Sequence, residues 1–435
     1  MLPAPRPAPE TARYSGCVAV NLRRGLDPVR LRADFPIFEQ RFHGKPLVYL
    51  DSASSAQKPR QVLDAMTRFY ETSYANVHRG VYELGERATE ALEGAREKVR
   101  AFVNAPKARE IIFVRNATEA LNLVAYSFGL DNLGPGDLVL ATELEHHSNF
   151  VPWQAIARRT GADFAMIPLD GGGELALDEL ERFEGRSVKV VAAGLVSNAL
   201  GTVNDVSRLA GWAHARGAIL VVDAAQAAPH RAIDVQTLGA DFIAVSGHKM
   251  CGPSGIGFLW GTSELLHSMS PFLYGGHMIR HVGDQETTWG ELPAKFEAGT
   301  APMAEAVGLG AAIDYLSEVG LEAIEAHEQA LVVHALEQLG DIPGVTVYGP
   351  PAESRAAIVS FNVATRSGGE IHPHDVAQML DLDAIAIRAG HHCCQPLMRK
   401  LGVLATNRAS FYLYNEHADV DRLADSVRRA QETFA

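Results

Sequence analysis

The chain has 435 residues, of which 47% are apolar and 21% charged, and its formal net charge at pH 7 is −13. This size allows a large buried core divided between two domains, and the acidic balance argues against a surface that binds nucleic acid. The longest apolar runs, such as "VVAAGLV" at 190–196, are shorter than the roughly 18 residues that cross a bilayer, so we expect neither nucleic acid nor membrane as a partner.

The four cysteines, Cys17, Cys251, Cys393 and Cys394, are too few and too scattered for a disulfide framework. This usage suits a reducing compartment, and we expect a cytoplasmic protein. Two of them lie side by side in "GHHCCQP" at 390–396. Neighbouring residues on an extended loop point mostly apart, and no CxxC or HxxxH pattern adds ligands, so we expect no metal site.

The N-terminal residues 1–25 are rich in proline, alanine and arginine and have no helical or strand period. We expect a disordered extension, because such a composition cannot bury enough apolar surface to fold. It has no apolar stretch typical of a secretory signal, whereas its arginines leave an organelle transit peptide as an alternative. Residues 26–58 are expected to associate with the second of the two domains.

From residue 59 to 310, helical patterns alternate with short apolar runs, and the expected strands begin near residues 110, 137, 188, 218, 241 and 255. This alternation predicts an α/β domain with a mostly parallel sheet covered by helices on both faces. Ligands of such sheets bind outside the carboxyl ends of the strands. We therefore expect the ligand-binding and catalytic residues at those ends.

A helical stretch at 303–320 is followed by a different order of elements. One further helix precedes the short expected strands "VTVYG", "AIVSFNV", "AIAIR" and "ASFYLYN", and a last helix ends the chain. This order predicts a smaller α+β domain over 311–435. The "GHHCCQP" loop belongs to that domain and must reach the larger one if it acts there.

Polar motifs follow three of the expected strands: "HHSN" at 146–149, "DAAQ" at 223–226 and "SGHK" at 246–249. Asp223 and Lys249 would be held at the sheet edge, where a buried charge is costly without a partner. Pyridoxal phosphate offers both partners, since a carboxylate stabilises its protonated ring nitrogen and a lysine amine condenses with its aldehyde. Read alone, such an aspartate is more often a helix N-cap.

Further residues could surround the same cofactor. His146 could lie flat against its ring, and Gln226 and Asn198 could contact its phenolic oxygen. The phosphate needs donors near a helix N-terminus. Thr118 at the start of an expected helix, together with Ser246 and His248, could provide them.

The chain resembles the class V aminotransferase group of fold-type I pyridoxal-phosphate enzymes, and more closely the group II, SufS-type cysteine desulfurases. The resemblance runs from about residue 26 to the C-terminus. The matching motifs include "ANVHRGVYELGERAT", "FVRNATEALNLVA", "EHHSNFVPW", "VVDAAQAAPH", "SGHKMCGPSGIG", "FEAGTAPM" and "RAGHHCCQPLM". It implies a seven-stranded sheet in the larger domain and pyridoxal 5'-phosphate as cofactor.

By this resemblance Lys249 binds the cofactor covalently, Asp223 pairs with its ring nitrogen, and His146 stacks on the ring and moves protons. Thr300 would reach the phosphate of a neighbouring subunit, which implies a homodimer. The residues expected to bind substrate are Arg408, Arg388, His78 and Arg79. Ser148 and Cys394 depart from the residues common in the family, and we expect neither to touch these roles.

Cys393 aligns with the nucleophile that accepts sulfur from L-cysteine, leaving L-alanine and a persulfide for iron-sulfur cluster assembly. Arg388, His391 and His392 would favour its thiolate, and Cys251 is expected to be a packing residue. The loop is short and has little reach, so we expect a SufE-like or SufU-like acceptor protein to come to it. The alternatives are a selenocysteine lyase, an aminotransferase, a kynureninase-like hydrolase and a non-catalytic sulfur carrier.

Overall fold

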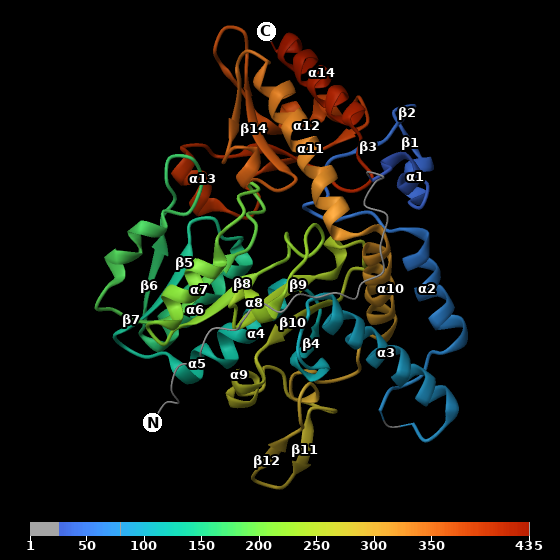
Figure 1. Ribbon diagram of the computed structural model, residues 1–435, viewed down its shortest axis with the longest axis vertical. Helices are drawn as coiled ribbons and strands as arrows, with labels where there is room; N and C mark the ends of the chain where they lie inside the picture. The colour runs from blue at the N-terminus through green and yellow to red at the C-terminus, as the bar shows by residue number, and fades with distance from the viewer. Residues whose placement is uncertain (1–25, 79, 435) are drawn as a thin grey trace, which may run out of the picture.

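The computed structural model describes residues 26–78 and 80–434 (Figure 1). The extension expected at 1–25 and the expected substrate-binding residue Arg79 lie outside the described residues. The described chain forms a larger domain around one sheet and a smaller domain that lies over one end of it (Figure 1).

A seven-stranded sheet forms the centre of the larger domain, in the order β4-β10-β9-β8-β7-β5-β6. Strands β5 to β9 pair in parallel, and β10 runs antiparallel to both of its neighbours. The strands are β4 (Ile111–Val114), β5 (Asp137–Thr142), β6 (Asp163–Ile167), β7 (Ser187–Gly194), β8 (Ile219–Asp223), β9 (Phe242–Ser246) and β10 (Gly257–Gly261). The predicted fold class is confirmed.

Strand β6 is the one member of this sheet that the apolar pattern did not predict. It lies at the sheet edge and pairs only with β5 among the described strands. Most of its residues are partly exposed, and its sequence "DFAMI" lacks the β-branched run that marks the buried strands. An edge strand of this kind depends on its neighbour more than on its own composition.

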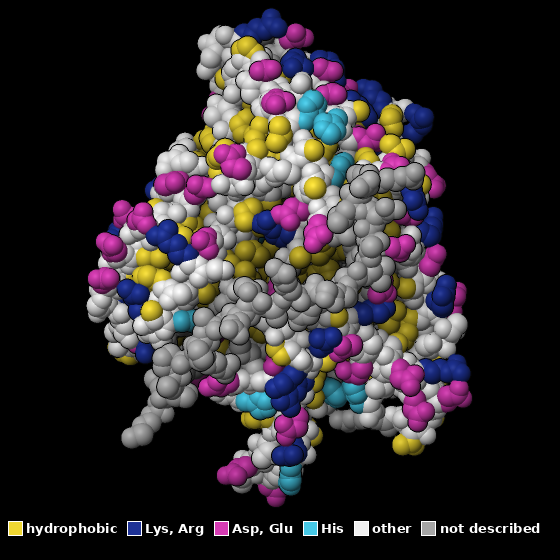
Figure 2. All heavy atoms as spheres, in the orientation of Figure 1, with side chains coloured by type: hydrophobic (Ala, Val, Ile, Leu, Met, Phe, Trp, Pro, Cys, Tyr) yellow, Lys and Arg dark blue, Asp and Glu magenta, His cyan; other side chains and the backbone are white. Residues whose placement is uncertain are grey.

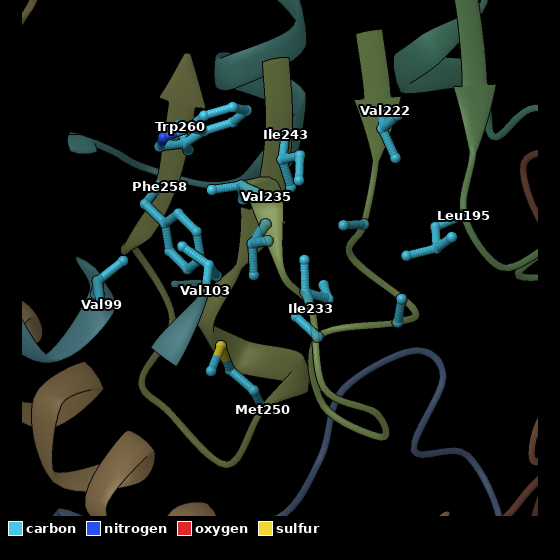
Figure 3. Close-up of a cluster of buried hydrophobic side chains, with 14 of the residues drawn as sticks. Val99, Val103, Leu195, Val222, Ile233, Val235, Ile243, Met250, Phe258 and Trp260 are labelled. Atoms are coloured by element: carbon cyan, nitrogen blue, oxygen red, sulfur yellow. The ribbon is translucent and has the colours of Figure 1, made fainter. Parts of the chain in front are cut away.

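Helices cover both faces of the sheet, and each face has its own apolar core. On one face lie α3 (Glu83–Phe102), α7 (Val206–His214), α8 (Val235–Leu238) and α10 (Met303–Val319), with α2 (Arg60–Thr72) packed against α10. On the other lie α4 (Ala117–Ser127), α5 (Gly129–Asn132), α6 (Val151–Thr160) and α9 (Ser263–Ser268). Figure 3 shows part of the first core, where Val103 at the end of α3 lies close to Val235 and Phe258.

The smaller domain is built on a five-stranded sheet with the order β13-β14-β18-β17 and β15 paired to β14. Its strands are β13 (Val345–Tyr348), β14 (Ile358–Ala364), β15 (Glu370–Ile371), β17 (Arg388–Gly390) and β18 (Thr406–Ser410). Its helices are α11 (Leu321–Gly340), α12 (Pro373–Asp381), α13 (Gln395–Leu401) and α14 (His417–Thr433). Residues of α11, α12 and α14 bury one face of this sheet.

The N-terminal segment joins the smaller domain through a short parallel pair. Strand β3 (Val48–Tyr49) pairs with β16 (Ile385–Ala386). Before it lie α1 (Pro28–Arg32) and the hairpin of β1 (Arg41–Phe42) and β2 (Lys45–Pro46). A second hairpin, β11 (Ile279–Val282) with β12 (Thr287–Trp289), projects from the larger domain at the opposite end of the molecule (Figure 1).

Two expectations need adjustment in the smaller domain. The strand expected over "ASFYLYN" is wrong in its position, because β18 covers Thr406–Ser410 and the chain then leaves the sheet. The turn is local: Phe411 N–H still bonds to Ala357 O in the register of β14, and the next N–H, that of Tyr412, donates instead to Asn415 Oδ1 at 2.9 Å. The boundary drawn at residue 310 falls inside α10, which packs on α2 and α3, so we propose that the larger domain extends to the end of this helix.

Three features of the described residues bear on membranes, metal ions and nucleic acid as possible partners. None of the helices is both long and apolar enough to cross a membrane. The described part of the chain holds no cluster of three or more residues that could ligate a metal ion. Figure 2 shows acidic and basic side chains interspersed on one face of the molecule, without an extended basic field of the kind that tracks a phosphate backbone.

Candidate active site

A cavity lies at the carboxyl ends of β5, β7, β8 and β9, where the smaller domain meets the larger. The cavity thus lies at the end of the sheet at which the strand-end rule places ligands. Residues predicted for the site that line this cavity are Thr118, His146, Asn198, Asp223, Gln226, Ser246, His248, Lys249, Arg388 and Arg408. Strand ends far apart in the sequence are thus brought together with two arginines of the smaller domain.

Asp223 and Lys249 face the cavity from neighbouring strand ends. Asp223 is the last residue of β8, and its Oδ1 accepts a hydrogen bond from the backbone N–H of Ala225 at 3.0 Å. Burial raises the pKa of the Asp223 carboxyl, and the Lys249 charge opposes the rise. Burial also lowers the pKa of the Lys249 amine to about 8, against the attraction of Asp223. The Lys249 amine therefore has a larger neutral, nucleophilic fraction near neutral pH than an ordinary lysine.

His146 lies at the start of the short 3₁₀ turn η3 (His147–Asn149). Its Nδ1 accepts a hydrogen bond from the backbone N–H of Ser148 at 3.1 Å. Burial lowers the pKa of His146 to about 3, and the charge of Lys249 contributes to the lowering. The imidazole is therefore neutral at physiological pH and can stack on another ring.

Hydroxyl groups gather near the N-terminus of α4. Ser246 Oγ accepts from the backbone N–H of Ala117 at 2.9 Å, and Thr118 Oγ1 lies 2.7 Å from Ser148 Oγ. Uncompensated N–H groups at a helix start favour an anion. Ser148 Oγ also lies 3.0 Å from His146 Nδ1, so this departure from the family contacts a predicted site residue.

His248 lies between this region and the N-terminal segment. Its Nδ1 lies 3.2 Å from Ser55 Oγ, and its backbone oxygen accepts from Lys58 Nζ at 2.8 Å. Burial lowers the pKa of His248 to about 4, and the charge of Lys249 adds to this effect. At neutral pH the ring can therefore offer a hydrogen bond but not a full positive charge.

Arg408 reaches the cavity from β18 and is almost fully buried. Its guanidinium donates to Asn198 O at 2.7 Å, to Ser54 Oγ at 2.8 Å and to Asp51 Oδ1 at 3.2 Å. Its Nε is buried and has no hydrogen-bond partner among the described residues. A guanidinium that lines a cavity is suited to a carboxylate ligand, because it combines a permanent charge with donors in a planar fork.

The cysteine loop connects β17 to α13 and borders this cavity. Cys393 is partly buried, and its Sγ lies 3.8 Å from an Nη of Arg388. It does not itself line the cavity, although Arg388 and His392 do. His392 and Cys393 have φ values of 51° and 56°, a left-handed conformation that residues with a Cβ adopt only under constraint.

His392 does not have the electrostatic role expected of it. It is buried, and its Nε2 lies 2.9 Å from Thr406 Oγ1. Burial lowers its pKa to about 2, so the ring is neutral and adds no positive charge next to Cys393. The expectation that His392 favours the thiolate is wrong, whereas Arg388 contacts the thiol directly and the role expected of His391 stays a prediction.

The second cysteine of the doublet is fully buried, in contrast to the first. Cys394 Sγ donates to Asn198 Oδ1 at 3.1 Å and packs in an apolar cluster with Leu144 and Leu397. Burial raises the pKa of its thiol strongly, so it is not a nucleophile at neutral pH. Cys251 is also buried, with its pKa raised to about 12, in agreement with a packing role.

Comparison with known proteins agrees with this arrangement. The family model for aminotransferase class-V matches residues 48–423. The chain belongs to the aminotransferase class-V family.

Relatives in this family share most of the chain. A probable cysteine desulfurase of Halalkalibacterium halodurans is 52% identical over 92% of this chain and 97% of its own length. A cysteine desulfurase of Haloferax volcanii is 46% identical over 94% of this chain and 98% of its own length. Among solved structures, the cysteine desulfurase CsdA of Escherichia coli is 38% identical with a TM-score of 0.86, covering 94% of this chain and all 100% of the CsdA chain.

Pyridoxal phosphate, which the family resemblance implies, fits the residues of the cavity. The Lys249 amine makes no hydrogen bond to another described residue, and Gln226 Oε1 is buried without a hydrogen-bond partner among them. Buried polar groups nearly always have a hydrogen-bond partner, so a bound ligand is expected to supply one here. Lys249, Asp223 and His146 would hold the ring, and the start of α4 would hold the phosphate.

Asn198 is engaged differently from the expectation for this family. Its Nδ2 donates to His392 O at 2.7 Å, while its Oδ1 accepts from Cys394 Sγ. Both ends of the amide thus bond to the cysteine loop, even though the residue lines the cavity. Cys394, the second departure from the family, therefore contacts a predicted site residue.

Glu145 is a buried carboxylate that sequence reasoning missed. It accepts hydrogen bonds from Asn149 Nδ2 at 2.6 Å and from the backbone N–H of Gly194 at 2.9 Å. Burial raises its pKa to about 8. It ties the turn that bears His146 to the end of β7, and an acid directly before "HHSN" was the available signal.

Thr300 and His78 do not reach the cavity of their own chain. Thr300 is exposed and lines a separate hollow of about 580 Å³ together with His277. The His78 ring stacks on His277, with 5.0 Å between ring centroids. Within one chain, the structure therefore does not bring His78 together with the other predicted substrate-binding residues, Arg388 and Arg408.

Proposed function

We propose that this protein is a pyridoxal-phosphate-dependent cysteine desulfurase, which converts L-cysteine to L-alanine and leaves the sulfur on Cys393. The observation that carries the proposal is the position of the cysteine loop, which borders the cavity of Lys249 and Asp223 with Cys393 Sγ 3.8 Å from Arg388. An aminotransferase or a kynureninase-like hydrolase has no use for a nucleophilic thiol at this place.

The cofactor, when bound, supplies an electron sink for negative charge at the substrate Cα. Lys249 is placed to take the Cα proton, because its pKa, lowered to about 8, leaves a larger neutral fraction of the amine near physiological pH than an ordinary lysine has. The Asp223 carboxylate would stabilise the positive charge on the ring nitrogen of the cofactor. His146 is neutral and can pass protons on the other side of the ring.

Arg408 lines the cavity, and its guanidinium would bind the substrate carboxylate there. The Cys393 thiolate, favoured by Arg388, attacks the substrate sulfur. A sulfur–sulfur bond forms, the bond between Cβ and sulfur breaks, and its electron pair stays on the three-carbon fragment. That fragment is protonated and leaves as L-alanine, while Cys393 carries the persulfide.

The proposal includes two kinds of partner. Thr300 and His78 would approach a second copy of the chain, because neither lines the cavity of its own chain: Thr300 lines a hollow with His277, and His78 stacks on His277. A SufE-like or SufU-like protein would take the sulfur from the short cysteine loop and pass it to iron-sulfur cluster assembly. We propose a cytoplasmic location, since the three described cysteines are free thiols.

The proposal is tested by supplying L-cysteine and a reductant to the purified, cofactor-loaded protein and measuring sulfide and alanine. Equal yields of the two products are expected. Pyruvate and ammonia in place of alanine, or transfer of the amino group to a keto acid, would indicate another reaction of the family.

A further inference from the structure

His147 contacts the cysteine loop at points that the proposed reaction does not use. Its backbone N–H donates to Cys393 O at 2.7 Å, and its Nε2 accepts from the backbone N–H of Gln395 at 3.1 Å. Its ring also lies beside that of His391, with 5.6 Å between centroids. One residue of the larger domain therefore holds the loop on both sides of Cys394.

The loop needs such support for two reasons. His392 and Cys393 are held in the left-handed conformation, which is unfavourable for both residue types. Helix α13 begins at Gln395, and its N-cap residue Cys394 makes no side-chain capping bond. The first N–H groups of a helix have no partner inside it, and His147 supplies one from another domain.

The position of His147 links the loop to the cofactor side of the cavity. It follows His146 directly, and both belong to the turn at η3 that Glu145 ties to β7 through Asn149 and Gly194. A shift of this turn would therefore move the stacking ring and the cysteine loop together.

We propose that His147 is a positioning residue for sulfur transfer, which holds Cys393 in register with the cavity by bonding the loop and capping α13. The inference rests on the proposed desulfurase function and names a further residue that its sulfur-transfer step needs. His147 touches neither substrate nor cofactor in this account. Its Nε2 must stay unprotonated to accept the bond from Gln395, and burial and the neighbouring His391 lower its pKa in agreement with this.

The test compares His147→Ala with His147→Gln. The amide oxygen of glutamine can occupy nearly the same place as Nε2, so the second variant retains an acceptor for Gln395. Each variant is given L-cysteine, whose sulfur must go to Cys393, and L-cysteine sulfinate, whose leaving group departs without that thiol. Rapid-quench measurement of alanine gives the rate of the first turnover with each substrate.

In His147→Ala we expect the first turnover of cysteine to slow by about five- to tenfold, as for one lost hydrogen bond, and sulfinate turnover to stay unchanged. In His147→Gln the cysteine rate should recover. Hydrogen exchange over 391–397 should be faster in His147→Ala than in the other two proteins, because the Gln395 amide loses its acceptor.

Two results would overturn the inference. Unchanged cysteine turnover in His147→Ala would show that the contact does not position Cys393. A parallel loss with cysteine and sulfinate would show that His147 supports the cavity in general. A wild-type protein that forms no alanine from cysteine would instead contradict the proposed function, and the exchange measurement would still report on the contact itself.

Discussion

Arg388 and Arg408 are direct partners across the antiparallel pair of β17 and β18, and both guanidinium groups donate to the same hydroxyl, Ser54 Oγ, at 3.1 Å and 2.8 Å. Beyond this shared contact they diverge. Arg388 reaches Cys393 Sγ, whereas Arg408 reaches Asp51 and Asn198 O. The pair thus concentrates positive charge at the cavity, and we propose that Arg388 acts on the thiol and Arg408 on the substrate.

This division predicts different kinetic effects for two matched substitutions. Arg408→Lys should raise the KM for L-cysteine by about tenfold or more, because a bond from guanidinium to a carboxylate is lost. Arg388→Lys should instead slow the first turnover and lower the rate at which iodoacetamide alkylates Cys393. Thermal melting of both variants serves as the control for folding. Equal effects of both changes on KM would contradict the separate roles.

Substitution of the cofactor lysine should remove covalent attachment. In Lys249→Ala the protein should lose its yellow colour on dialysis and lose turnover of cysteine, because no other lysine lines the cavity. Absorbance spectra before and after dialysis, with pyridoxal phosphate added back, give the readout. Retention of both colour and activity would show that Lys249 is misassigned.

The pH dependence of cofactor attachment follows from the lowered pKa of Lys249. In the protein freed of cofactor, the amine is protonated and unreactive below about pH 8 and neutral above it. The rate of reattachment should therefore rise with pH and level off above about 8, whereas an ordinary lysine would give a rise continuing toward about 10.4. Stopped-flow absorbance at a series of pH values measures this, and a midpoint near 10 would contradict the effect of burial.

The strand-end rule and the order of elements were enough to predict the larger domain and most of the cavity. Asp223 and Lys249 follow apolar strands directly, so the parallel sheet must carry them to one edge. The edge strand β6 was not predictable, because its partly exposed residues carry no buried-strand pattern. The end of β18 was misplaced because the strand ends before the apolar run does. The Tyr412 N–H turns away from the sheet and donates to Asn415 Oδ1.

Contacts between residues distant in sequence were beyond prediction. Nothing in "EHHSN" shows that His147 Nε2 meets the N–H of Gln395, and nothing in "GHHCC" shows that its second thiol bonds to Asn198. The prediction of a positive charge at His392 was wrong for a related reason. Its burial depends on the packing of the loop against β18, and that burial keeps the ring neutral.

The short loop predicts that removal of the persulfide limits turnover. A chain of a few residues held by His147 and Asn198 cannot carry Cys393 far from the cavity. We expect about one alanine per active site to form quickly, followed by a slow phase that a SufE-like or SufU-like acceptor accelerates. Rapid-quench assays with and without the acceptor measure both phases. A linear time course that neither acceptor changes would contradict this expectation.

The two neighbouring cysteines should behave differently. Cys393→Ser should abolish formation of alanine from cysteine, because the partly buried thiol beside Arg388 is lost. Cys394→Ser should leave most of the activity, since the hydroxyl can still donate to Asn198 Oδ1. Turnover of cysteine sulfinate in both variants controls for an intact cavity. Equal loss in the two variants would indicate a shared structural effect.

The central claim is that Cys393 receives the sulfur of L-cysteine. The most direct measurement is mass spectrometry of the cofactor-loaded protein after brief exposure to L-cysteine, with the peptides around residues 388–399 sequenced by fragmentation. We expect the mass of one added sulfur atom on Cys393 and none on Cys394 or Cys251. Added sulfur on Cys394 alone, or none on any cysteine while alanine is formed, would contradict the account.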